Sequence, residues 1–122
     1  MLQKELYNKL NKNSSLTDIQ LYIKEIIEVR GFANQSVQEN MLLFFEEAGE
    51  LAKAIRKDTE GMSVDEERLY KYDTIENEVA DVLIVLLSIC NKLDISLYKA
   101  FMEKEKVNIE RNWKINKEDK QL

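Results

Sequence analysis

Residues 78–87 read EVADVLIVLL, and they are the strongest indication of the fold in the sequence. Apart from the glutamate that opens it and Asp81, it is apolar on nearly every face of a helix. A helix that is hydrophobic all round is normally buried on most of its sides. We therefore expect a buried helix that starts at Asp73 or Thr74 and ends near Lys92.

Start and stop signals outside this stretch predict three further long helices. Ser36 with Glu39 three residues later forms a capping box, and Gly31 is a typical residue just after a helix end. Between these signals apolar residues recur at helical spacing. The predicted helices cover residues 17–30, 36–57 and 96–113, after a short or frayed helix near the N-terminus. With short connections, they predict an all-α fold that resembles a four-helix bundle.

The composition supports one helical domain and excludes several functions. The 122 residues include 3 Gly and no Pro, too few for a structure rich in tight turns. The absence of His removes the commonest general base and nearly all zinc and di-iron sites. A net charge of −5 argues against binding to a nucleic-acid backbone. We expect one domain over residues 1–122, with its core in 17–113 and a loose charged tail in 114–122.

Cysteine content and hydropathy predict where the protein works. A single Cys excludes an internal disulfide framework and fits the reducing cytoplasm. The first ten residues lack the apolar segment of a signal peptide, and no apolar run is long enough to span a bilayer. We therefore expect a cytoplasmic protein that binds neither membranes nor nucleic-acid polymers.

Two of the predicted helices carry paired acids that an ordinary bundle does not need. Glu78 and Asp81 are three residues apart, and Glu47 and Glu50 repeat this spacing on the preceding long helix. Residues three apart lie about 60° apart around a helix and one turn along it. If the two pairs face each other, they form a cluster of four carboxylates that cannot all stay ionised without cations.

Such a cluster offers only hard oxygen ligands. This donor set selects Mg²⁺, with Mn²⁺ as a substitute, over zinc or copper. Glu47 and Glu50 taken alone also fit a solvated helix face with Lys partners, and a buried salt bridge would also explain Asp81. The two matched pairs on apolar helices together favour a metal site.

The last predicted helix carries a cationic stripe. Lys104, Asn108 and Arg111 are spaced i, i+4 and i+7, which puts them on one face. Opposite a hydrated metal cluster, this face would bind a polyphosphate. Glutamates are interleaved with the stripe, so a solvated charged face is the simpler interpretation of the spacing alone.

Taken in order, these blocks resemble the MazG-like nucleoside triphosphate pyrophosphohydrolases. Residues 43–54, LFFEEAGELAKA, are similar to the E-E-x-x-E block of that family, and residues 78–83, EVADVL, to its E-x-x-D block. Residues 104–113 resemble the K-x-x-x-N-x-x-R-x-W ending of small single-domain members. The resemblance runs from about Thr17 to Trp113, which is most of the chain.

The resemblance implies a magnesium-dependent hydrolase. Members cleave nucleoside triphosphates between the α and β phosphates, giving a monophosphate and pyrophosphate, and a role in cleaning the nucleotide pool would follow. Carried over to this sequence, metal binding falls to Glu47, Glu50, Glu78 and Asp81. The additional family acid is Glu46, to which we assign a role in orienting or deprotonating water. Triphosphate contacts fall to Lys53, Lys104, Asn108 and Arg111, and a homodimer or homotetramer is expected to complete the bundle.

Base recognition is predicted just before or at the start of the first acidic helix. Phe32 could stack on a base there, and Asn34, Gln35 and Gln38 could hydrogen-bond to it. The sequence does not indicate which base or sugar is preferred. Two alternatives stay open: a non-catalytic helical interaction module whose acids form salt bridges, and a relative of the same fold that acts on phosphoribosyl-ATP or on a single deoxynucleotide.

Overall fold

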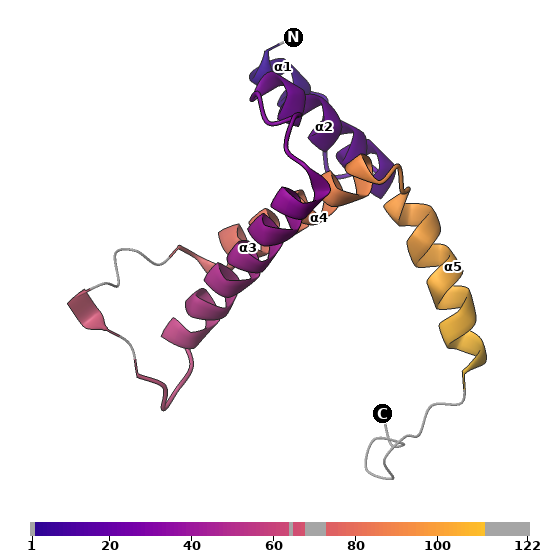
Figure 1. Ribbon diagram of the computed structural model, residues 1–122. Helices are drawn as coiled ribbons and strands as arrows, with labels where there is room; N and C mark the ends of the chain where they lie inside the picture. The colour runs from indigo at the N-terminus through magenta and orange to yellow at the C-terminus, as the bar shows by residue number, and fades with distance from the viewer. Residues whose placement is uncertain (1, 64, 68–72, 112–122) are drawn as a thin grey trace.

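The computed structural model describes residues 2–63, 65–67 and 73–111, and the described chain is all-helical. Figure 1 shows two short N-terminal helices at one end, a long antiparallel pair, and a last helix that leads away from that pair. The helices are α1 (Gln3–Asn8), α2 (Leu16–Val29), α3 (Val37–Lys57), α4 (Ile75–Lys92) and α5 (Leu97–Glu110). The prediction of an all-α fold is confirmed.

The helix starts are set by side-chain caps. Ser36 accepts a hydrogen bond from the backbone N–H of Glu39, whose carboxylate accepts one from the backbone N–H of Ser36. Ser15 forms the same reciprocal box with Asp18 at the start of α2. These bonds satisfy backbone donors that a helix leaves unpaired in its first turn. The capping box predicted at Ser36 is therefore confirmed, and α2 ends just before Gly31, whose φ is +82°.

The core lies where α1, α2 and α4 meet. It consists of Leu6, Ile23, Ile26 and Leu87, with Ile26 and Leu87 fully enclosed. α3 packs along α4, while α5 is joined to the rest chiefly through α2 (Figure 1). The described helices therefore do not close around one common axis, because α5 extends away from the α3–α4 pair.

Burial along α4 differs from the sequence prediction. Its second half is buried from Leu87 to Cys90, as expected for the apolar run. Its first half is open, since 51% of Val79 and 38% of Leu83 remain exposed. The difference arises because the sequence predicts how apolar a helix is but not which neighbour covers it. Within the described residues, no element of the same chain covers this side of α4.

The C-terminal part of the chain is described only as far as Arg111. The predicted last helix reaches Glu110 among the described residues, and Trp113 and the tail over 114–122 lie outside them. None of the described helices is long and apolar enough to cross a membrane.

Candidate metal centre

Three carboxylates from the two long helices meet in one place. Oxygen atoms of Glu47 on α3 and of Glu78 and Asp81 on α4 all lie within 4.8 Å of one another. The two residues on α4 are one helical turn apart, so both can face the same residue of the antiparallel α3. The predicted meeting of the two acidic helices is thus observed for three of the four acids.

Burial and like charge act together on these acids. Glu78 is 6% exposed, and loss of solvent together with the neighbouring charges of Asp81, Asp73 and Glu50 raises its pKa above the ordinary value of 4.5. Half-buried Glu47 also has a raised pKa, mainly through burial and then through the charge of Asp81. Both effects disfavour the ionised form, so the cluster is unfavourable as three bare carboxylates.

Glu50 and Glu46 stand beside the three without joining them. The Glu50 carboxylate lies 3.7 Å from the ammonium nitrogen of Lys53, one turn further along α3, and both side chains are about two-fifths exposed. Its charge still raises the pKa values of Glu47 and Glu78. Glu46 is exposed and also contributes to the raised pKa of Glu47. Both residues are therefore close enough to act on the centre electrostatically.

The donor set fits a hard divalent cation. It supplies carboxylate oxygens only, which suits Mg²⁺ or Mn²⁺. In the described part of the chain, no Lys or Arg lies within ion-pair distance of Glu47, Glu78 or Asp81. One cationic influence is Lys53, whose charge lowers the pKa of Glu78 without cancelling the opposite effects of burial and of the neighbouring acids. The negative charge of the cluster therefore suits a bound cation.

The cationic stripe is not brought to the acids within one copy of the chain. Lys104, Asn108 and Arg111 follow α5, which contacts α2 and leads away from α3 and α4 (Figure 1). The Asn108 amide donates a 2.8 Å hydrogen bond to the carboxylate of Glu105 on its own helix. The spacing of the three residues predicts that they share one face of the helix. It does not predict which part of the protein that face contacts, because this depends on the direction of α5.

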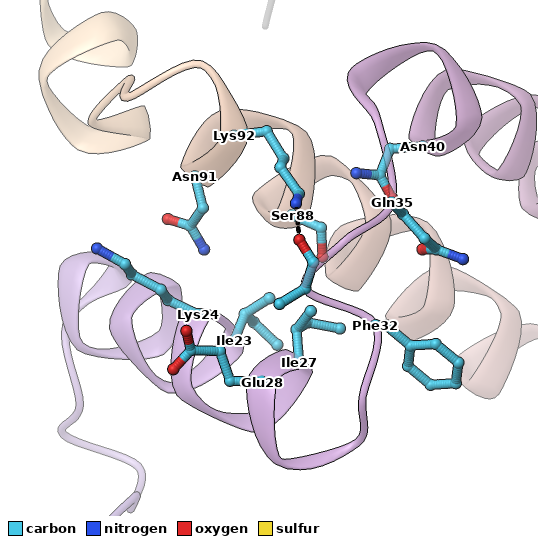
Figure 2. Close-up of a pocket in the computed structure, with 11 residues that line it drawn as sticks. Ile23, Lys24, Ile27, Glu28, Phe32, Gln35, Asn40, Ser88, Asn91 and Lys92 are labelled. Carbon is cyan, nitrogen blue, oxygen red and sulfur yellow. Dashed lines mark hydrogen bonds between the residues drawn. The ribbon is translucent and has the colours of Figure 1, made fainter.

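A pocket lies between α2, the α2–α3 connection, α3 and α4 (Figure 2). Phe32 and Gln35 line it, as does Ile27 on its apolar wall. Asn34 and Gln38 are exposed and are not among its lining residues. Of the four predicted base-binding residues, the structure therefore brings two to a pocket and leaves two on the surface.

Six polar lining residues were missed by sequence reasoning: Lys24, Glu28, Asn40, Ser88, Asn91 and Lys92. Asn40 interrupts the apolar face of α3, and Ser88 interrupts the apolar run of α4. Polar residues inside apolar stripes are the signal that could have indicated them. Lys92 also donates a hydrogen bond to the backbone carbonyl of Ala33, which ties the α2–α3 connection to α4 (Figure 2).

Comparison with known families now gives the centre its context. Residues 35–115 match the family described as the MazG nucleotide pyrophosphohydrolase domain. The chain belongs to the MazG family. The matched region contains α3, α4 and α5, and so both acidic helices of the candidate metal centre. No curated protein matches the chain. Membership supports nucleotide pyrophosphohydrolase activity in general, in a family that generally uses a divalent metal.

Proposed function

We propose that this MazG protein hydrolyses nucleoside or deoxynucleoside triphosphates to a monophosphate and pyrophosphate, with Mg²⁺ as its cofactor. The observation that carries the proposal is the cluster of Glu47, Glu78 and Asp81, in which one carboxylate is almost fully buried and none is paired with a cationic side chain among the described residues. Acids whose pKa values are raised by burial and by one another are concentrated at functional sites of proteins.

The acids take the metal-binding roles in this proposal. Glu47, Glu78 and Asp81 would hold the metal directly, and Glu50 lies one turn from Glu47 where it can join them. The bound cation supplies positive charge that polarises the phosphate and lowers the pKa of water. Glu46, exposed beside the cluster, would orient the attacking water or accept a proton from it.

The reaction itself requires positive charge beside the leaving group. Water attacks the α-phosphorus, the bond from that phosphorus to the bridging oxygen breaks, and pyrophosphate leaves with the bridging oxygen. Cationic donors must therefore face the β and γ phosphates. Lys53 on α3 lies beside Glu50 and is suitably placed for this. For Lys104, Asn108 and Arg111 the proposal requires a second copy, since α5 does not approach the acids of its own chain.

Exposed apolar side chains support such an assembly. Along one face of α3, Leu42 is 72% and Phe45 is 67% exposed, and the stripe continues through exposed Gly49 and Ala52. A Cβ at Gly49 would meet open space, so no neighbour among the described residues requires glycine there. Large contiguous apolar patches are normally covered by a partner. We propose that a second copy covers the α3–α4 face in a homodimer or a larger homo-oligomer.

One panel tests the reaction class. The eight ordinary NTPs and dNTPs are incubated with Mg²⁺, and monophosphate and pyrophosphate are both quantified, with EDTA as the control. We expect EDTA-sensitive release of both products in equal amounts. Release of inorganic phosphate with a diphosphate instead would overturn the proposed cleavage between the α and β phosphates.

Two variants make the panel specific to the candidate centre. Glu78→Gln should abolish turnover, while Glu76→Gln, the same change at an exposed position on the same helix, should not. Silence across the panel with a clear Mg²⁺-induced rise in melting temperature would indicate a substrate outside the ordinary nucleotides, such as phosphoribosyl-ATP. Silence with no thermal response to Mg²⁺ or Mn²⁺ would favour a non-catalytic interaction module.

A further inference from the structure

The pocket shown in Figure 2 has the size and lining of a site for one ring system. Its volume is about 170 Å³, with Ile23 and Ile27 of α2 forming apolar walls and Phe32 at its edge. Pockets for drug-sized ligands measure roughly 300–1,000 Å³ and combine apolar walls with a few polar groups. A whole nucleotide would not fit here, but a planar heterocycle would.

Asn40 presents an amide to this pocket. Its residue is only 4% exposed, and within the described residues no hydrogen bond joins its side chain to another group of the protein. Figure 2 shows this side chain directed toward Ser88 and Lys92, into the pocket. An amide at this position can hydrogen-bond to water or to a ligand that enters the pocket, because it has two donors and an acceptor to offer.

Ser88 stands opposite and keeps acceptor capacity. Its hydroxyl donates a 2.9 Å hydrogen bond to the backbone carbonyl of Ile84, so the hydrogen is committed while lone pairs of the oxygen are not. The pocket, which Lys24 and Glu28 also line, thus offers donors and an acceptor from Asn40 and a further acceptor from Ser88. That combination matches the edge of a nucleobase, where N–H donors alternate with carbonyl or ring-nitrogen acceptors.

A second hollow connects this pocket with the acidic end of the helix pair. It shares Ile27, Phe32, Gln35, Asn40 and Ser88 with the first pocket, and it continues to Leu43, Ile84 and Val85. Leu43 is one turn before Glu47 on α3, and Ile84 is one turn after Asp81 on α4. The hollow therefore runs along the α3–α4 pair from Asn40 toward the carboxylates.

The spacing along both helices is the same. Asn40 is seven residues before Glu47, and Ser88 is seven residues after Asp81 on the antiparallel helix. Seven residues make two turns, which return a side chain to nearly the same face about 10.5 Å along the axis. This separation is on the scale of a nucleoside, whose sugar stands between its base and its α-phosphate.

We propose that this pocket holds the base of the substrate nucleotide and that Asn40 is the residue that selects it. The inference rests on the proposed function, because it takes the carboxylates as the site of the α-phosphate. The base enters beside Phe32, its edge pairs with the Asn40 amide, and the sugar lies over Leu43 and Val85. Asn40 is a specificity-determining residue and takes no part in the chemical step.

Binding is tested first without metal and without turnover. Nucleoside monophosphates and ribose 5-phosphate, which has no base, are titrated in EDTA and followed by protein NMR. We expect at least one monophosphate to bind at least tenfold more tightly than ribose 5-phosphate, and Asn40→Leu to remove that difference. Asn8→Leu, the same change at an exposed position of α1 outside the pocket, should leave it intact. Equal binding of ribose 5-phosphate and every monophosphate would overturn the proposal.

Folding of the variant is controlled by its melting temperature. Because no hydrogen bond joins the Asn40 amide to another described group of the protein, Asn40→Leu should melt at the wild-type temperature or above it. A clear fall would assign Asn40 to the fold rather than to a ligand and would overturn the proposal. Asn40→Asp replaces the amide donors by acceptors at nearly constant size, so it should change which base binds best.

Turnover separates this inference from the proposed reaction. If the nucleotide panel is active and neither Asn40 variant changes KM or the ranking of the bases, the reaction stands and the pocket proposal fails. If the panel is silent while monophosphate binding depends on Asn40, the pocket proposal stands and the reaction fails. If both hold, Asn40→Leu should raise KM at least tenfold for the preferred nucleotide and change kcat less.

Discussion

Glu47 on α3 and Asp81 on α4 hold carboxylate oxygens within 4.8 Å of each other, and the charge of Asp81 is the strongest electrostatic influence on Glu47. Two like charges at this distance repel, and burial around Glu78 strengthens the effect because solvent screens it less. The arrangement therefore works against the stability of the metal-free protein. A cation bound between these carboxylates would relieve the repulsion, and it should therefore stabilise the folded protein.

The first prediction concerns the pH dependence of stability without metal. The pKa values of Glu47 and Glu78 are raised above 4.5, so just above that pH the folded protein binds more protons than the unfolded chain. The free energy of unfolding should therefore increase as the pH is lowered from 7 toward 5. Stability is lost again as the pH rises through the raised pKa values. Urea denaturation in EDTA at several pH values measures this.

Asp73 sets the lower limit of that experiment. Hydrogen bonds from the Asn77 side chain and the Thr74 backbone lower its pKa below 3.8, so the stability it contributes is lost in more acidic solution. The window for the acid cluster thus begins at pH 4.5 and extends up to the raised pKa values of Glu47 and Glu78. A stability that falls steadily as the pH drops across this window would contradict the prediction, and Glu78→Gln should flatten the dependence.

The second prediction separates stability from activity at Glu78. Replacing this buried carboxylate by the neutral amide of Gln removes repulsion from Glu47 and Asp81 in the metal-free protein, so the melting temperature in EDTA should rise. Turnover should fall by more than about 100-fold, since loss of even an indirect metal partner costs about 10–100-fold. The stabilising response to Mg²⁺, about 2.7 kcal/mol at a concentration of 100 Kd, should also disappear.

The same variant can also contradict the assignment of Glu78 to the metal centre. A Glu78→Gln protein that melts lower in EDTA yet keeps its response to Mg²⁺ would make Glu78 a structural residue. Glu76→Gln, on the exposed side of α4, is the matched control for both the melting temperature and the turnover.

Local signals in the sequence were sufficient to predict the helices and the meeting of the acids. The capping box at Ser36 and the left-handed conformation of Gly31 depend only on residues a few positions away. A local sequence pattern is therefore sufficient to predict both. The i, i+3 spacing of Glu78 and Asp81 likewise fixes their common face. That they would meet Glu47 followed from two apolar helices with one matched motif each.

The features that could not be predicted depend on the relative placement of whole helices. The direction of α5 is set at the turn before it, where Asp94 has a left-handed φ of +55°, and no spacing within α5 reveals it. The pocket beside Asn40 combines residues from three helices and one connection, so its polar lining looked like isolated exceptions in apolar stripes. Val79 is exposed because no described helix packs against its side of α4, and the hydropathy of the sequence does not predict this.

The third prediction concerns the junction that orients α5. The Gln20 amide nitrogen donates to the Asn91 side-chain oxygen at 3.0 Å and to the Ile95 carbonyl at 2.7 Å, and its oxygen accepts from the Leu97 N–H at 3.0 Å. At about 1 kcal/mol for each bond, Gln20→Leu should lower the free energy of unfolding by roughly 2–4 kcal/mol. Chemical denaturation measures the change.

A conservative variant shows whether these bonds are the cause. Gln20→Glu keeps an acceptor for the Leu97 N–H but sets a carboxylate oxygen against the Asn91 side-chain oxygen and the Ile95 carbonyl, so it should also be less stable than wild type. Equal stability of all three proteins would show that the junction is held by apolar packing around Leu97 instead.

The last prediction concerns assembly through the α3–α4 face. Phe45 is 67% exposed on α3 and belongs to the stripe that we propose a second copy covers. Burying a Phe side chain contributes about 1.5–3 kcal/mol, and a charge at the same place would be left desolvated. Phe45→Lys should therefore weaken self-association by at least about 10-fold, where a factor of ten corresponds to about 1.4 kcal/mol. Light scattering across a dilution series measures this, with wild type expected at twice the 14.4 kDa of one chain or more.

Tyr7→Lys provides the matched control for that experiment. Tyr7 is 65% exposed on α1, away from the α3–α4 pair, so the same charge there should leave the measured mass unchanged. If Phe45→Lys dissociates the assembly and also lowers turnover while the helical signal persists, the loss links assembly to the cationic stripe of a second copy. A wild-type protein that is monomeric at every concentration and fully active would instead require α5 to serve the acids of its own chain.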